Sequence, residues 1–134
     1  MKQFLVAYLG AALTFLAVDY VWLTHVARNF FVERLGHLLL DKPIYAAAGG
    51  FYLLYAVGIV IFAVMPALRI GSPGLALMYG ALFGFFCYGT YDITNFATLK
   101  GWPVQVMMVD VAWGTALTGL SALAGFAAAK SFGS

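Results

Sequence analysis

Charge is scarce in this 134-residue chain, of which only 9% is Asp, Glu, Lys or Arg, against about 25% in an ordinary soluble protein. Seven basic and five acidic side chains cannot cover the surface of a soluble domain of this size. The net charge of +2 is small, and the basic residues form no run. A nucleic-acid backbone needs a continuous positive track, so we expect no nucleic-acid partner.

Cysteine is nearly absent as well. Cys87 stands alone, which excludes an internal disulfide and a cysteine-based metal cage. The sequence has no Ser-His-Asp arrangement and no glycine-rich phosphate loop, and Glu33 and His37 lack an obvious third metal ligand. We therefore expect no metal site and no cofactor. Enzymatic activity is left open, with a non-enzymatic function favoured.

Apolar residues are what the chain has in excess: they make up 64% of it, and the mean hydropathy is +0.95. A helix rises about 1.5 Å per residue, and the hydrocarbon core of a bilayer is about 30 Å thick. Four apolar segments are long enough to cross it, at residues 4–25, 44–65, 74–93 and 104–129. The sequence predicts an all-α polytopic membrane protein with four transmembrane helices in one domain, residues 1–134. We expect the first span to be an anchor rather than a cleaved leader.

Prolines and turns mark the predicted helix ends. Pro43 is suited to open the second span and Pro66 to close it, while prolines also precede the third and fourth spans. Between the first two spans, residues 28–42 carry an amphipathic pattern. It predicts a short interfacial helix, which lies either in the headgroup plane or over the mouth of the bundle.

Four spans place both termini on one side of the membrane, here named side one, and the 28–42 and 99–103 connections on the other, side two. Lys and Arg number three on side one and four on side two. This balance does not decide the orientation by the positive-inside rule. Because side one carries no acidic residue, we expect cytoplasmic termini.

Small residues in the third and fourth spans predict close helix contacts. Gly80 and Gly84 form a G-x-x-x-G pair, and a similar stripe of small residues runs from Gly114 to Gly125. Such stripes serve contacts inside a bundle or between copies of a chain. A homodimer through Gly80 and Gly84 is therefore one of two expectations.

Aspartates fall within the predicted spans at Asp19, Asp92 and Asp110. An aspartate at the centre of a transmembrane helix costs about 2.5–3.5 kcal/mol. It needs a partner, water, a proton or a place near the interface. The first and third spans run toward side two, and the fourth begins there. All three aspartates are therefore predicted to lie in the side-two half.

Aromatic and amide side chains accompany these aspartates. The spacings Asp19-x-x-Trp22 and Asp110-x-x-Trp113 put carboxylate and indole on one helical face. We predict a ligand pocket open toward side two and built from Asp19, Trp22, Tyr88, Tyr91, Asp92, Asn95, Asp110 and Trp113. Three alternatives stay open. The aromatics form an interfacial belt, Asp19 and Asp110 make structural hydrogen bonds, or Asp92 and Asn95 cap a helix end.

The Tyr-Asp-Ile-Thr-Asn run at residues 91–95, with the two Asp-x-x-Trp segments, resembles the bacterial membrane family catalogued as domain of unknown function 2177. The resemblance extends over nearly the whole chain. It implies a four-helix protein of the bacterial inner membrane with no established activity. It also implies a connection with lipids, because relatives are often encoded near lipid-modifying enzymes.

These patterns lead us to expect a membrane protein that binds a small polar or cationic ligand, or a lipid headgroup, for transport or presentation. The aspartates would supply charge, the aromatic rings walls and cation–π contacts, and Asn95 orientation. One alternative is a lipid-modifying membrane enzyme, or an accessory factor to one, with Asp92 and Asp110 as an acid–base pair. Another is a scaffold subunit of a larger membrane complex.

Overall fold

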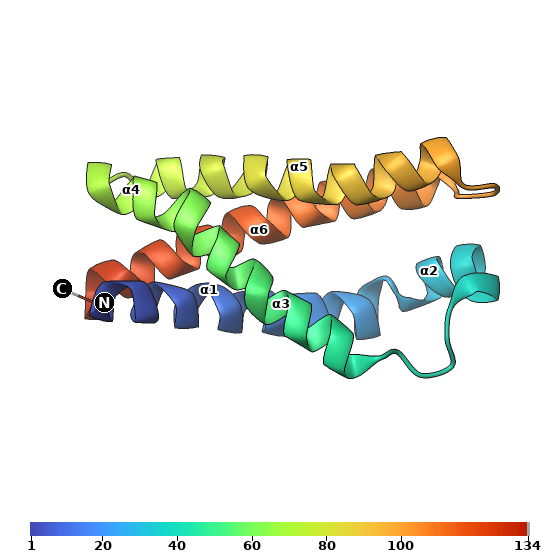
Figure 1. Cartoon of the computed structure of the whole chain (residues 1–134), viewed down its shortest axis with the longest axis horizontal. Coiled ribbons are helices and arrows are strands. Elements are labelled where there is room, and N and C mark those ends of the chain that lie inside the picture. The colour runs from blue at the N-terminus through green and yellow to red at the C-terminus, as the bar shows by residue number, and fades with distance from the viewer. Residues whose placement is uncertain (134) are drawn as a thin grey trace.

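The computed structural model describes residues 1–133, which form four long helices side by side (Figure 1). The first span comprises α1 (Lys2–Val21) and η1 (Trp22–Val26), and the second comprises α3 (Tyr45–Ile59), η3 (Val60–Val64) and α4 (Met65–Ile70). The third is α5 (Pro73–Thr98), and the fourth is α6 (Val104–Phe132). All four are long and apolar enough to cross a membrane. The predicted all-α fold with four spans is confirmed.

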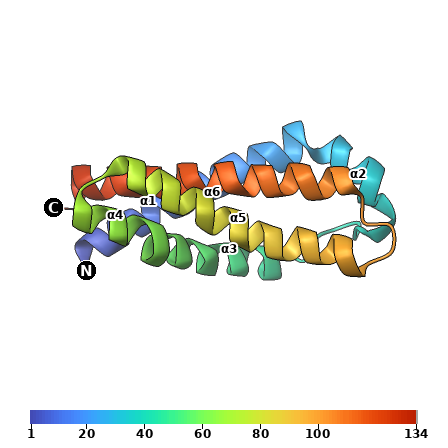
Figure 2. The same ribbon diagram turned by 90° about the horizontal axis from the view of Figure 1, so that it is seen from above.

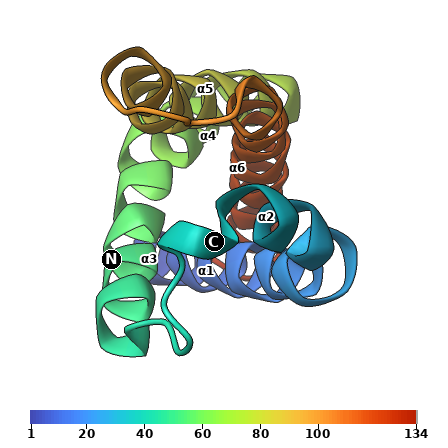
Figure 3. The same cartoon turned by 90° about the vertical axis from the view of Figure 1, so that its right-hand side faces the viewer.

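When the bundle is seen from its side-two end, α5, α6, α1 and α3 run along the four sides of a square outline (Figure 3). α6 packs along both α5 and α1, and its contact with α5 is the most extensive in the bundle (Figure 2). Both termini and the turn between α4 and α5 lie at one end, side one (Figure 1). The connections that follow α1 and α5 lie at the other end, as the alternation of spans requires.

Glycines let α5 and α6 approach closely. A Cβ added at Gly80 would lie 2.6 Å from the Cβ of Ala122, and one at Gly84 would lie 2.7 Å from the Cβ of Thr118 and still closer to the carbonyl oxygen of Gly114. Neither separation is possible between real atoms, so only glycine fits at these two positions. The G-x-x-x-G pair is therefore used within the chain. The homodimer through Gly80 and Gly84 stays a prediction.

The hydrophobic core lies mainly in the side-one half. α1 contributes Ala7, Ala11 and Phe15, the second span residues from Tyr55 to Ala67, and α6 residues from Leu117 to Ala129. Many of these side chains are small, which brings the helix backbones together. The side-one half is therefore tightly packed, whereas the aspartates lie toward the other end.

Pro66 does not end the second span, and this prediction is wrong. The helix continues to Ile70 and ends at Gly71, whose φ is +82°. A proline inside an α-helix lacks an N–H and clashes with the carbonyl four residues earlier, here that of Phe62. The π-helical turn η3 ends at Val64, two residues before Pro66, and changes the hydrogen-bond spacing there. The chain thus passes Pro66 without leaving the helix.

The third span is also longer than expected, since α5 continues past Ile93 to Thr98. Asp92 therefore lies inside the helix and not at its last turn. The last turn is closed by a backbone bond from the N–H of Leu99 to the carbonyl of Asn95. The interpretation of Asp92 and Asn95 as a helix-end cap is wrong.

The predicted short helix is present as α2 (Arg28–Leu35), followed by the single turn η2 (Gly36–Leu38). Leu35 is buried and Phe31 half-buried. Figure 3 shows both elements across the side-two end of the bundle. Of the two placements that the sequence allowed, the structure shows the one over the bundle mouth.

Candidate functional site

A cavity of about 670 Å³ lies at the side-two end of the bundle. α1, α5 and α6 form its walls, and the segment from Arg28 to Pro43 covers it. Its charged lining residues are Arg28, Asp41, Asp92 and Asp110, and its aromatic ones include Tyr20, Tyr45, Tyr91 and Trp102. A volume of this size holds a small organic group.

Asp92 is the most unusual residue of the cavity wall. Its side chain is 0% exposed, and neither carboxylate oxygen has a hydrogen-bond partner among residues 1–133. The carboxyl group of Asp110, from α6, lies beside it, close enough for a hydrogen bond once one of the two carries a proton. An ionised carboxylate only accepts hydrogen bonds, so the two repel each other. The pair needs a shared proton or a cation.

Asp19 has a different environment. It is 6% exposed, and the indole N–H of Trp113 donates to its Oδ1 at 3.0 Å. The ring of Trp113 also stacks on Trp22, with centroids 4.2 Å apart and planes 8° from parallel. The two Asp-x-x-Trp motifs thus interlock across α1 and α6. For Asp19 this is the structural hydrogen bond that one alternative expected.

The three aspartates form a chain of neighbouring carboxyl groups in the side-two half of the bundle. Asp92 lies beside Asp110, and Asp110 is near enough to Asp19 for the two charges to repel. The hydroxyl of Tyr52 lies close to Asp19. No group of three or more His, Cys, Asp or Glu side chains in the described part of the chain is arranged to hold a metal ion.

The remaining predicted residues lie around these three aspartates. Tyr88 packs against Gly114 and meets the ring of Tyr55 edge-on at 6.3 Å. Tyr91 is 57% exposed and meets Trp102 edge-on, with centroids 5.8 Å apart. The cavity wall includes three of the eight predicted residues, namely Tyr91, Asp92 and Asp110. The other five do not line it: Asp19, Trp22, Tyr88, Asn95 and Trp113.

The eight predicted residues leave out several polar or aromatic residues that line the cavity, among them Tyr20, Arg28, Asp41 and Trp102. Arg28 is exposed and makes no ion pair within residues 1–133. Arg28 and Asp41 reach the cavity because the 28–43 segment folds over the mouth. That placement was one of the two left open, and the amphipathic pattern alone does not choose between them.

A lateral groove of about 650 Å³ runs along α1 and α3. It shares Tyr20, Leu23 and Tyr45 with the cavity, so these residues border both spaces. Leu13, Leu16 and Gly49 line its outer part. α3 crosses the bundle diagonally, and its first turns lie away from α5 (Figure 1). The groove therefore lies beside the membrane-facing surface of α1.

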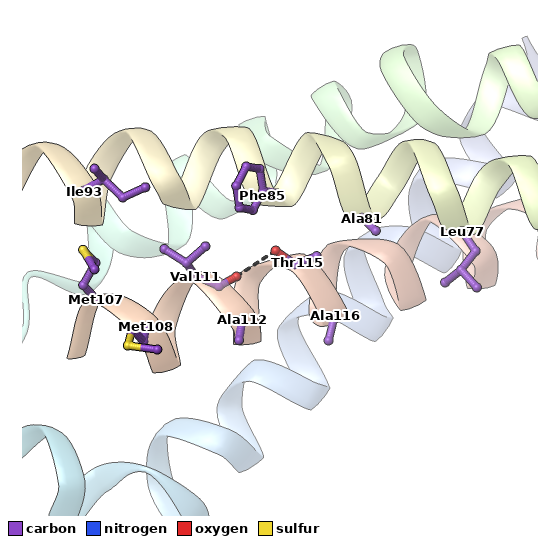
Figure 4. A pocket seen from close by; sticks show the side chains of 10 residues that line it. All are labelled: Leu77, Ala81, Phe85, Ile93, Met107, Met108, Val111, Ala112, Thr115 and Ala116. Atoms are coloured by element: carbon purple, nitrogen blue, oxygen red, sulfur yellow. Dashed lines mark hydrogen bonds between the residues drawn. The ribbon is translucent and has the colours of Figure 1, made fainter. Parts of the chain in front are cut away.

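A third groove, of about 530 Å³, lies between α5 and α6 on the outer face (Figure 4). Its lining is apolar apart from Thr115, whose hydroxyl donates to the carbonyl of Val111 in the same helix at 2.8 Å. No charged side chain in the described residues lines it. We assign it no chemistry beyond contact with lipid chains.

Residues 4–127 match the family described as predicted membrane protein (DUF2177), which covers nearly the whole chain. The resemblance drawn from the aspartate motifs is confirmed by this match. The chain has no match among curated proteins and none among solved structures.

Proposed function

We propose, for a chain that belongs to the DUF2177 family of predicted membrane proteins, that the side-two cavity binds a small cationic group. The group is a free organic cation or the amine of a lipid headgroup. Asp92 and Asp110 supply the negative charge, and the surrounding tyrosines and Trp102 supply aromatic faces.

One observation carries this proposal: the carboxylate of Asp92 is fully buried, lacks a hydrogen-bond partner in the described residues and lies beside a second carboxylate. Buried polar groups are nearly always hydrogen-bonded, and an uncompensated buried charge is costly. An ammonium group answers both requirements, because its N–H groups donate and its charge separates the two carboxylates.

The Asp19–Trp113–Trp22 cluster supports the cavity and does not line it directly. Its hydrogen bond and ring stack tie α1 to α6 beside Asp110. We assign these residues a positioning role. The packed side-one core favours binding and presentation at side two. A path through the membrane would need a second copy of the chain.

The experiment uses the purified protein in detergent, with ethanolamine and choline as probes. Binding is followed by the shift in melting temperature. Asp92→Asn and Asp110→Asn should weaken binding about tenfold or more, and Glu33→Gln is the matched control because Glu33 is exposed and lies outside the cavity. Native mass spectrometry of the same samples reports a retained ligand. Unchanged binding by Asp92→Asn would overturn the proposal.

The adjacency of Asp92 and Asp110 also favours a second candidate function, a membrane enzyme that modifies lipids. Two neighbouring carboxyl groups that hold one proton between them provide an acid and a base. A deletion strain should then show a changed lipid profile that wild type restores and Asp92→Asn does not. An unchanged profile in the deletion strain would exclude this candidate.

A further inference from the structure

We infer that the ligand is an aminophospholipid that reaches the cavity sideways from the membrane, between α1 and α3. This inference rests on the proposed function, because the amine of the headgroup occupies the site beside Asp92 and Asp110. It adds the chemistry of the rest of the ligand and the route by which it arrives.

The first argument is that the cavity and the lateral groove are adjacent. Tyr20, Leu23 and Tyr45 line both spaces, the carboxylate pair lines only the cavity, and the rest of the groove lining is apolar except for Asp19 and Tyr52. A ligand that fills both spaces has a polar head joined to an apolar tail. The combined shape fits a lipid better than a small soluble amine, which would leave the groove unfilled.

The second argument is the order of charges. Asp92 is fully buried in the cavity wall, whereas Arg28 and Asp41 are exposed, and Arg28 carries no ion pair within residues 1–133. Arginine is well suited to phosphate, which its planar fork of donors binds in pairs. A headgroup with an ammonium at its tip and a phosphate behind it matches a carboxylate pair inside and an arginine at the mouth.

The third argument is the position of Arg28 along the first span. It follows η1 after one residue, at the side-two end of a span that begins at Lys2. Basic side chains at span ends reach the level of the lipid phosphates. The phosphate of a lipid in the side-two leaflet therefore lies at the height of Arg28, and its acyl chains run along the groove toward Leu13.

Gly49 and Gly50 of α3 offer a matched pair of variants. Gly49 lines the lateral groove, Gly50 does not, and a Cβ at either position meets no atom within 4 Å. Gly49→Trp places a large ring in the groove, whereas Gly50→Trp places the same ring outside it. Gly49→Leu is the smaller replacement, should the tryptophan prevent folding.

The experiment measures lipid retention by native mass spectrometry of detergent-purified protein. The probes are phosphatidylethanolamine, phosphatidylglycerol, soluble phosphoethanolamine and ethanolamine. We expect phosphatidylethanolamine to be preferred to phosphatidylglycerol by about tenfold. Gly49→Trp should lose that lipid and still bind ethanolamine, Gly50→Trp should keep both, and Arg28→Gln should weaken binding of the lipid more than that of ethanolamine.

The outcomes separate the two proposals. Equal retention of both lipids, or retention of phosphatidylethanolamine by both Gly49 variants, overturns the sideways lipid site. Phosphoethanolamine binding as tightly as the lipid, in wild type and Gly49→Trp alike, identifies a soluble zwitterion as the ligand instead. If ethanolamine does not bind wild type, or binds Asp92→Asn equally well, the proposed function itself is wrong.

Discussion

Trp113 makes two contacts that join α1 to α6 at the same level of the bundle. Its N–H donates to the buried Asp19, and its ring stacks on Trp22. The indole N–H of Trp22 is also buried, but it has no partner within residues 1–133. Two tryptophans in equivalent motifs therefore contribute differently: Trp113 through a hydrogen bond and a stack, Trp22 through the stack alone.

This difference predicts an asymmetry between two similar substitutions. Trp113→Phe removes the donor to Asp19 and should lower the free energy of unfolding by about 1–2 kcal/mol more than Trp22→Phe. Both changes shorten the same stacked ring system, so the second controls for lost packing. Unfolding in detergent by titration with a denaturing surfactant measures the difference. Equal losses would mean that the hydrogen bond contributes nothing.

Replacing Asp92 should raise the stability of the ligand-free protein, in contrast to the tryptophan substitutions. Replacing it by Asn removes one of two adjacent carboxylates and gives Asp110 an amide N–H as a possible donor. Asp92→Asn should therefore unfold at a higher temperature than wild type when ligand is absent, by an amount that corresponds to about 1 kcal/mol or more. Melting of ligand-stripped protein in detergent checks this. A lower melting temperature would show that Asp92 supports the fold.

At the scale of whole elements, α5 and α6 form the closest pair in the bundle. Their contact depends on positions where any side chain would collide with the other backbone. Gly84 faces Gly114 and Thr118 in this way, whereas a Cβ at Gly89 would come no nearer than 3.6 Å to Ile93. Both glycines are buried, so burial alone does not distinguish them.

Alanine substitutions should separate these two glycines. Gly84→Ala forces the helices apart and should cost about 2 kcal/mol or more of stability. Gly89→Ala adds a methyl group at ordinary contact distance and should lie within about 1 kcal/mol of wild type, on the stabilising side. Thermal melting of both variants and wild type in the same detergent measures these two changes in stability. Similar losses at both sites would contradict the close approach at Gly84.

The sequence predicts the existence of each span well, because the length of the apolar run decides it. It predicts the helix ends less well, because they depend on single residues and local backbone geometry. The existence of four spans follows from apolar runs too long for any other role. Pro66 resembles a helix end in the sequence because the π-helical turn that accommodates it has no simple residue signature. The sequence predicts too early an end for α5 because Asp92 and Asn95 resemble terminal residues, although the helix continues beyond both.

At the scale of the whole molecule, the side-one half is a packed apolar core, and the side-two half holds the aspartates and the cavity. The direction of the helices sufficed to place three aspartates in one half. It did not show that Asp92 pairs with Asp110 while Asp19 binds Trp113. Pairing depends on how each helix is rotated about its axis, and the nearly uniform apolar surfaces of these helices conceal that rotation from sequence reasoning.

Orientation can be tested on the intact protein. We expect the inner membrane of a bacterium, with side one cytoplasmic. In a Cys87→Ser background, Ile70→Cys lies at side one and Lys100→Cys at side two, and both positions are exposed. A membrane-impermeant maleimide added to intact cells should label Lys100→Cys and leave Ile70→Cys unlabelled until the membrane is opened. The reverse pattern would invert the orientation.

The hydrogen bond between Asp19 and Trp113 joins residues 94 positions apart, which has a consequence for biosynthesis. α1 leaves the ribosome and enters the bilayer long before Trp113 has been translated. During that interval Asp19 has no indole partner, and the apolar residues around it must hold the nascent helix in the lipid unaided. A chain that stalls before α6 therefore holds Asp19 in the membrane without its indole donor.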